Sequence, residues 1–304
     1  MKVKISPSTL TTNEILSIIN KSGYVMEQRV AGVLENAKWR VSQSYKFQDQ
    51  GTGVSREVDI LSDKSLSIAL SNEVNLVATV ELIIECKGDD SPLIVFPRTS
   101  KSSLSPDMFA FIGNPYPAVM KLVKTNPNSG CVEKEGNNRY NVISNLASKM
   151  DKSFLDNNTS ILGCQACSIY GKKDAEKDSK NEDKFDANNT TYYGAIEELI
   201  KALTYRRVET NQRKEENIIA ITLIHPILIW REKIYIYDSA NKNLQETKYT
   251  SIYHSHRAGN VNGDFIIYVV QENSLNDFIS EMERHLSELM KSSQSYMKTI
   301  NVLK

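Results

Sequence analysis

Val80-Glu-Leu-Ile-Ile-Glu-Cys-Lys-Gly88 is the stretch of sequence that decides the fold. Its apolar and β-branched residues predict a strand over residues 77–87 that ends at the glycine. Side chains alternate between the two faces of a strand, so Glu85 and Lys87 share one face. A carboxylate and an ammonium at the end of an apolar strand are costly to bury unless they are paired or bound to a cation. Glu85 and Lys87 are therefore the first candidates for a functional site.

A second carboxylate interrupts an apolar strand further upstream. Ser55-Arg-Glu-Val-Asp-Ile60 places Asp59 between two apolar residues in a predicted strand over residues 56–61. Neighbouring strands lie about 4.8 Å apart. If this strand pairs with the one that ends at Lys87, Asp59 and Glu85 converge on one point. Two converging carboxylates suit a hard divalent cation, which takes oxygen ligands and keeps several waters.

The segments before these strands predict one more carboxylate near the site. Thr12 can cap a first helix, Gly23 interrupts it, and a second helix with a buried apolar stripe follows over residues 24–37. Glu27 lies beside that stripe. A strand over residues 39–47 and a glycine-rich turn over residues 49–53 predict a hairpin into the next strand. The predicted order is helix, strand, strand, strand.

A helix Glu27, a strand Asp59 and Glu85-Cys86-Lys87 at a strand end resemble the PD-(D/E)xK superfamily, which has the restriction-endonuclease-like fold and includes Mrr-like bacterial nucleases. The resemblance covers residues 24–88, with Val58 in place of the proline that gives the family its first letter. It implies an α/β fold with an αβββαβ core, in which helices flank a mixed central sheet.

Later segments complete such a core. Residues 192–207 have the apolar periodicity of an amphipathic helix, and residues 217–230 form a predicted strand broken by Pro226. We therefore expect one nuclease domain over residues 1–304, with its core in residues 12–88 and 192–230.

Two segments lie outside the expected core. Residues 89–191 are a long insertion, with a short helix at 142–150 and a mobile polar loop at 172–190. Residues 231–304 form a C-terminal strand and helix extension. In it we expect a hairpin over residues 230–238, a strand over 265–270 and a final helix capped by Ser274.

The resemblance also implies a mechanism. Asp59, Glu85 and the backbone carbonyl of Cys86 would bind Mg²⁺ or Mn²⁺, and the metal would activate a water and stabilise charge on the phosphate. Lys87 would orient that water or help to deprotonate it. Glu27 would hold a metal-bound water or a second cation, with Glu35 as the weaker candidate for the helix carboxylate. The reaction is hydrolysis of a phosphodiester.

Enzymes that this sequence resembles act most often on DNA, and the resemblance implies a role in bacterial defence, by restriction of foreign DNA or by damage to an infected cell. Two alternatives stay open: an effector that cleaves RNA, and a catalytically silent, nuclease-like binding subunit of a larger complex. The intact Glu85-Cys-Lys87 argues against the silent subunit, because such charges are costly to keep without a metal.

Charge gives a weaker indication of nucleic-acid binding. The 37 basic and 37 acidic residues cancel, so no broad positive field surrounds the chain, and a protein partner could help to hold the nucleic acid. A local basic cluster lies on and after the helix over residues 192–207. Its members, which could contact phosphates or form a solvated helix end, are Lys201, Arg206, Arg207, Arg213 and Lys214.

The remaining features favour a globular protein without other cofactors. The chain begins without an apolar segment and has no long apolar run, which favours a cytoplasmic protein and no membrane partner. Phosphate-loop, dinucleotide and H-E-x-x-H motifs are absent. The final helix could form a homo-oligomer, but its apolar stripe favours packing on its own core.

The cysteines and histidines do not complete a second site in the sequence. Cys164 and Cys167 have half the spacing of a zinc site, without a second pair of ligands, so we expect ordinary packed or exposed thiols here, and reduced thiols at all four cysteines. His254-Ser-His256 predicts a polar contact loop or a metal pair, with no third ligand close in sequence.

Overall fold

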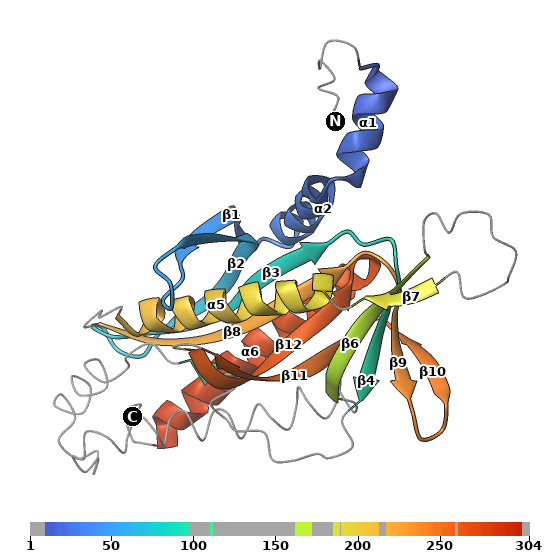
Figure 1. Ribbon diagram of the computed structural model, residues 1–304. Helices are drawn as coiled ribbons and strands as arrows, with labels where there is room; N and C mark the ends of the chain where they lie inside the picture. The colour runs from blue at the N-terminus through green and yellow to red at the C-terminus, as the bar shows by residue number, and fades with distance from the viewer. Residues whose placement is uncertain are drawn as a thin grey trace, which may run out of the picture.

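A computed structural model describes residues 10–97, 110–111, 162–171, 185–188, 190–212, 217–258 and 261–299. Its strands join in one twelve-stranded mixed sheet with helices on both faces (Figure 1). The predicted α/β class is confirmed.

The first elements follow the predicted order, with three antiparallel strands at one edge of the sheet. They are α1 (Thr12–Lys21), α2 (Gly23–Asn36), β1 (Arg40–Gln48), β2 (Ser55–Ala69) and β3 (Asn75–Lys87). The predicted turn joins β1 to β2, where Gly53 has a φ of 69° and its N–H donates to the Asp49 carbonyl at 2.7 Å. A positive φ suits glycine, which has no Cβ to clash.

The next two elements place a parallel strand beside β3. After α5 (Thr190–Gln212), β8 (Ile218–Trp230) runs parallel to β3 from the pair Asn75 and Ile218 to the pair Lys87 and Trp230. The carboxyl ends of both strands therefore lie side by side. Ligands of α/β sheets bind at such ends.

The segments predicted as insertion and extension add strands to the same sheet. Beyond β8 the strand order is β12, β11, β6, β4, β9 and β10, while β5 pairs with β8 and β7 with β6. Their bounds are β4 (Leu93–Pro97), β5 (Ala110–Phe111), β6 (Leu162–Gly171), β7 (Phe185–Asn188), β9 (Ile234–Asp238), β10 (Asn243–Thr247), β11 (Tyr249–Ala258) and β12 (Val261–Gln271).

Apolar side chains fill a core on each face of the sheet. On one face, the predicted stripe of α5 packs on the strands through Ile196, Leu199, Ile200 and Leu203. On the other face, α2 packs with α6 (Leu275–Thr299), which follows the short 3₁₀ helix η3 (Glu272–Ser274). The final helix thus buries its apolar stripe on its own core, as expected.

Two predictions about strands are wrong. Pro226 does not break β8. It pairs with Ile83 inside the strand, and β12, the neighbour on the other side, starts to pair only at Ile227. Residues 230–238 form no hairpin, because β8 already has neighbours on both sides and β9 pairs with β4 and β10 instead.

Within the predicted mobile loop, residues 185–188 form β7 on β6, so this part is a strand. The rest of that loop before α5 and the predicted helix over residues 142–150 lie outside the described residues.

One helix stands away from the sheet. α1 projects from the body (Figure 1), and its apolar Ile15, Leu16, Ile18 and Ile19 are exposed. In the described part of the chain, no helix is both long and apolar enough to cross a membrane.

Candidate active site

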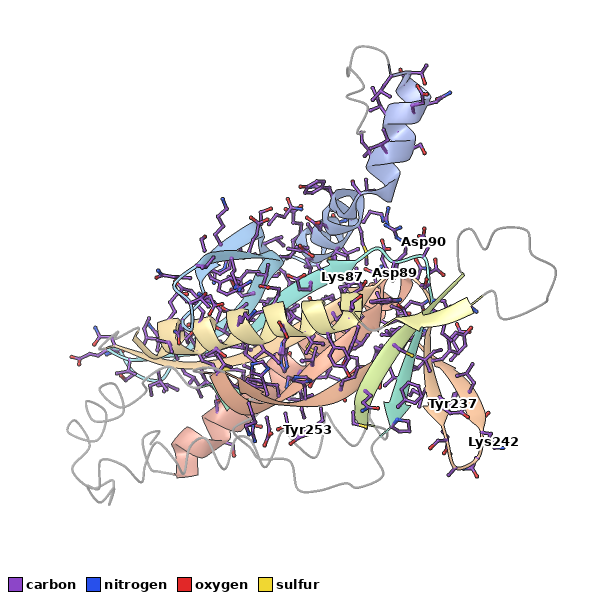
Figure 2. The ribbon with its side chains drawn as sticks, viewed as in Figure 1. Lys87, Asp89, Asp90, Tyr237, Lys242 and Tyr253 are labelled. Atoms are coloured by element: carbon purple, nitrogen blue, oxygen red, sulfur yellow. The ribbon has the colours of Figure 1, made fainter. Side chains whose placement is uncertain are left out.

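The carboxyl end of β3 gathers the predicted site residues. Figure 2 shows Lys87, Asp89 and Asp90 at this end of the strand, beside α2. Glu85 faces the α5 side of the sheet, while Cys86 belongs to the core on the opposite face. The strand alternation inferred from the sequence therefore holds to the last residue of β3.

Glu85 and Lys87 form an ion pair. The Lys87 ammonium donates to Glu85 Oε2 at 2.9 Å. Glu85 is 4% exposed, which leaves its carboxylate largely out of water. The two charged groups are neighbours, as their spacing predicts.

Asp59 lies where regular strand pairing stops. The ladder between β2 and β3 ends at Ile60 and Ile84, one pair before Asp59 would face Glu85. In place of the next strand pair, the Asp59 carboxylate accepts a hydrogen bond from the Cys86 N–H at 2.6 Å. A side chain thus ties the two strands together at this point.

The other neighbour of β2 is irregular at the same position. Pairing between β1 and β2 skips from Gln43 and Ile60 to Tyr45 and Val58, so Ser44 does not pair with Asp59. Ser44 has a φ of 50°, a conformation uncommon for residues other than glycine. Such irregularities re-aim side chains and gather at functional sites.

Glu27 reaches the same cluster from α2. The charges of Asp59 and Lys87 both act on its pKa, which places its carboxylate close to these groups. Gly23, one turn earlier, leaves room for it: a Cβ there would lie 3.2 Å from Glu27 Oε1. Glu35, the weaker candidate, is exposed near the far end of the helix.

The environment disfavours charge on all three carboxylates. Burial, together with the charge of Asp59, raises the pKa of Glu85 to about 7, although Lys87 opposes this. Burial also raises the pKa of Asp59 against the Cys86 N–H and Lys87. Burial and the charges of Asp59 and Glu57 raise the pKa of Glu27. A bound cation would reverse this penalty.

The donor set suits a hard cation that keeps part of its water shell. Among the described residues, no three His, Cys, Asp or Glu side chains lie close enough to hold a metal by themselves. Asp59 and Glu85 supply two carboxylates, so a backbone carbonyl and waters would have to complete the coordination. Mg²⁺ is bound in this way, through one or two carboxylates.

Three charged residues near the site were missed in the sequence. Glu57, two residues before Asp59, adds negative charge to the cluster. Glu198 on α5 acts on Glu85 and is held by Arg56 at 2.8 Å. Arg231 follows the last residue of β8. Only Glu57 had a local signal, because it alternates with Asp59 on the strand.

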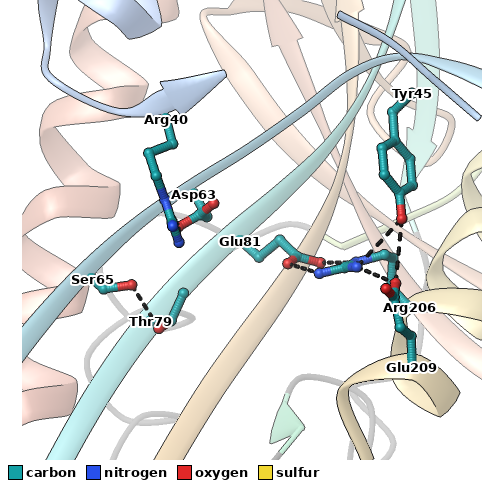
Figure 3. Close-up of polar contacts among 8 residues, drawn as sticks. All are labelled: Arg40, Tyr45, Asp63, Ser65, Thr79, Glu81, Arg206 and Glu209. Carbon is teal, nitrogen blue, oxygen red and sulfur yellow. Dashed lines mark hydrogen bonds and ion pairs between the residues drawn. The ribbon is translucent and has the colours of Figure 1, made fainter. Parts of the chain in front are cut away.

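One predicted phosphate-binding residue has a structural role instead. Arg206 is buried, with Nε and Nη2 donating to the two oxygens of Glu81 at 2.8 and 2.5 Å and Nη1 donating to Glu209 (Figure 3). Tyr45 adds its hydroxyl to the same network. The guanidinium is therefore occupied by protein acceptors, which corrects the prediction for Arg206.

The other basic candidates have different surroundings. Lys201 lies 3.7 Å from Glu197 and 3.9 Å from Glu198. The Arg207 guanidinium lies 5.6 Å from the centre of the Phe265 ring. Contact of these two side chains with nucleic acid stays a prediction, and Arg213 and Lys214 lie outside the described residues.

Among the residues that the structure describes, neither the cysteine pair nor the histidine pair joins a third side chain to form a metal site. Cys164 is exposed and Cys167 half-buried, three positions apart on β6, and Cys131 lies outside the described residues. His254 and His256 lie on β11, in a strand and not in a loop, with ring centres 6.0 Å apart. Burial and the neighbouring His256 lower the pKa of His254.

No protein-family model, curated protein or solved structure matches the chain. Function therefore has to be inferred from the geometry and chemistry of the site.

Proposed function

We propose that this protein is a metal-dependent endonuclease that hydrolyses phosphodiester bonds, with DNA as the substrate and bacterial defence or restriction as the role. The main support is one observation: buried Glu85 pairs with half-buried Lys87 at the end of β3, and Asp59 accepts a hydrogen bond from the N–H of Cys86, the residue between them. With the insertion strands β4 to β7 left aside, the order α2, β1, β2, β3, α5, β8 is compatible with an αβββαβ core.

Asp59, Glu85 and the backbone carbonyl of Cys86 would hold Mg²⁺ or Mn²⁺. When bound, such an ion lowers the pKa of a coordinated water and offsets the charge of the phosphate. Glu27, which approaches from α2, would hold a metal-bound water or a second cation. The raised pKa values of the three carboxylates support a cation as their natural partner.

Lys87 positions the reacting groups as a cation. Burial lowers its pKa, but the charge and hydrogen bond of Glu85 outweigh burial and raise it. Lys87 therefore keeps its proton at neutral pH, which favours orientation of the water over its deprotonation. Its ammonium also stabilises negative charge that develops on the phosphate.

Cleavage of a supercoiled plasmid tests this proposal, with Mg²⁺, Mn²⁺ or EDTA present. We expect nicking that needs metal and falls by about 100-fold or more in Asp59→Ala and Lys87→Ala, the usual size of such losses. Matched controls are Asp63→Ala on the same strand and Lys46→Ala on β1. Asp63 pairs with the exposed Arg40, and Lys46 is exposed, so both variants should cut normally.

Cleavage that survives EDTA, or that persists in Asp59→Ala and Lys87→Ala, would contradict the proposal. Cleavage of labelled RNA without cleavage of DNA would move the substrate to RNA. No cleavage of either, with no heat of metal binding by calorimetry, would instead indicate a silent binding subunit.

A further inference from the structure

Arg231 is tied to the site by its backbone. Lys87 and Trp230 form the last pair between β3 and β8, and the next residue, Arg231, donates its N–H to the Lys87 carbonyl at 3.2 Å. Its position at the carboxyl ends of two parallel strands is the usual place for a ligand. No local sequence pattern marks this residue, because the contact joins segments far apart in the chain.

The side chain of Arg231 lies against Gly88. A Cβ at Gly88 would be 2.6 Å from Arg231 Nη2, closer than real Cβ contacts, and 3.0 Å from Cζ, so the guanidinium would have to move. Glycine after Lys87 therefore provides the space that the guanidinium fills. The Arg231 side chain is 19% exposed, so the charge is held in place beside the strand end.

The guanidinium has spare donors. Its Nη1 donates to Asp90 Oδ1 at 3.0 Å, and its Nε is buried without an acceptor among the described residues. Arginine has five N–H donors, and two of them can bind one phosphate side by side. The Asp90 side chain is 83% exposed, and such surface pairs are weak enough for another anion to replace.

The loop does not need this ion pair to stay in place. Trp230 Nε1 donates to the Ser91 carbonyl at 2.8 Å in a buried contact. The Leu93 N–H donates to the Lys233 carbonyl at 2.9 Å. These bonds already anchor the segment after Gly88, so holding the loop does not account for Arg231.

The charge balance of the site calls for a fixed cation. Within the described ranges, Lys87 is the cation whose charge acts on Glu27, Asp59 and Glu85, and Glu57 adds a fourth carboxylate, so a bound divalent cation would still leave the cluster without excess positive charge. A phosphate would meet repulsion there. Arg231, whose guanidinium lies against Gly88 directly after Lys87, would supply positive charge at this strand end.

We propose that Arg231 binds a phosphate of the nucleic-acid strand beside the bond that is cut. The inference rests on the proposed function and adds a residue that holds the substrate strand.

Fluorescence anisotropy with a fluorescein-labelled 30-base-pair duplex, with Ca²⁺ in place of Mg²⁺, measures this contact. We expect Arg231→Ala to weaken binding by about tenfold and to lower the slope of log affinity against log salt by about one, as for loss of one phosphate contact. The matched control is Lys233→Ala, whose ammonium forms a surface pair with Glu246 at 2.8 Å. It should change neither quantity.

Two further variants retain Arg231 and distinguish ligand binding from a structural role. Gly88→Ala should displace the guanidinium and reproduce the loss seen with Arg231→Ala. Asp90→Asn should tighten binding about threefold, because it removes the competing carboxylate. A merely structural ion pair predicts no tightening in Asp90→Asn.

The inference is overturned if Arg231→Ala keeps the wild-type affinity and salt slope, or if Asp90→Asn does not bind more tightly. Metal-dependent plasmid cleavage by the wild type would still support the proposed function in either case. If Arg231→Ala does not fold, judged by circular dichroism, Asp90→Asn decides alone. A wild-type protein that neither binds nor cuts nucleic acid would overturn both proposals.

Discussion

Glu85 makes the stability of the metal-free protein depend on pH. Its pKa is about 7 in the folded chain, because of burial and the charge of Asp59, against an ordinary value near 4.3 when unfolded. The folded state therefore holds the proton more tightly, and stability present below about pH 4 is lost as pH rises through 7. The pKa values of Asp59 and Glu27 are raised as well and add to the same slope.

We expect Glu85→Gln to remove most of this slope and to stabilise the metal-free chain at pH 8, by up to about 3 kcal/mol. Urea denaturation at intervals between pH 5 and 8 measures it. Glu57→Gln is the control, because Glu57 is exposed and its removal should have a much smaller effect. A wild-type stability that does not fall over this range would refute the prediction.

Local sequence patterns were enough to single out the residues at the centre of the candidate site. Glu85 and Lys87 stand out because their spacing puts two charges on one face of an apolar strand, and Asp59 because it interrupts another. Arg231 and the role of Arg206 could not be found in this way. Arg206 occurs 125 positions from its partner Glu81, and only packing of α5 on β3 brings them together.

At the scale of elements, one buried ion pair fixes α5 on β3. Arg206 and Glu81 are both about 6% exposed in their side chains, and loss of one partner leaves the other charge buried. We expect Glu81→Ala to lower the free energy of unfolding by about 3 kcal/mol or more. Urea denaturation measures this loss. The double variant Glu81→Leu with Arg206→Met should lose less free energy of unfolding than Glu81→Ala, because it leaves no buried charge unpaired.

The surface pair of Arg40 and Asp63 is the control in the same experiment (Figure 3). The Arg40 side chain is 79% exposed, so Asp63→Ala should cost less than about 1 kcal/mol. An equal loss of free energy of unfolding in Glu81→Ala and Asp63→Ala would mean that the pair of Arg206 and Glu81 does not fix α5 on β3.

Elements with strong periodicity were predictable, while pairing between distant strands was not. The helix expected over residues 24–37 is α2 (Gly23–Asn36), because its apolar stripe is local information. The strand expected over residues 56–61 continues to Ala69 in β2, through polar Ser62, Asp63 and Lys64. Pairing with β3 over this stretch outweighs the low strand preference of these residues.

At the scale of the whole molecule, a single sheet joins the proposed core to the rest of the chain. β12 continues the sheet from β8, and its pairing ends at Gln271 and Trp230, next to Arg231. The C-terminal extension therefore pairs with β8 at the strand end where the candidate site lies, and the insertion reaches the same end through the Ser91 carbonyl, which accepts from Trp230 Nε1. Sequence patterns could not predict this union, because strand order depends on contacts across more than a hundred residues.

Since the site joins α2, β2 and β3, a cation bound there should stabilise the whole fold. A ligand that binds only the folded state adds about 2.7 kcal/mol at 100 times its Kd, which corresponds to a rise in Tm of roughly 5 °C for a chain of this size. We expect Mg²⁺ or Mn²⁺ to produce such a rise in Asp63→Ala and in the wild type but not in Asp59→Ala, measured by differential scanning fluorimetry. The rise should be larger at pH 8 than at pH 6, because Glu85 must lose its proton before it can bind the ion. An equal rise in Tm for Asp59→Ala would place the metal elsewhere in the protein. A rise in Tm that is smaller at pH 8 than at pH 6 would exclude Glu85 as a ligand.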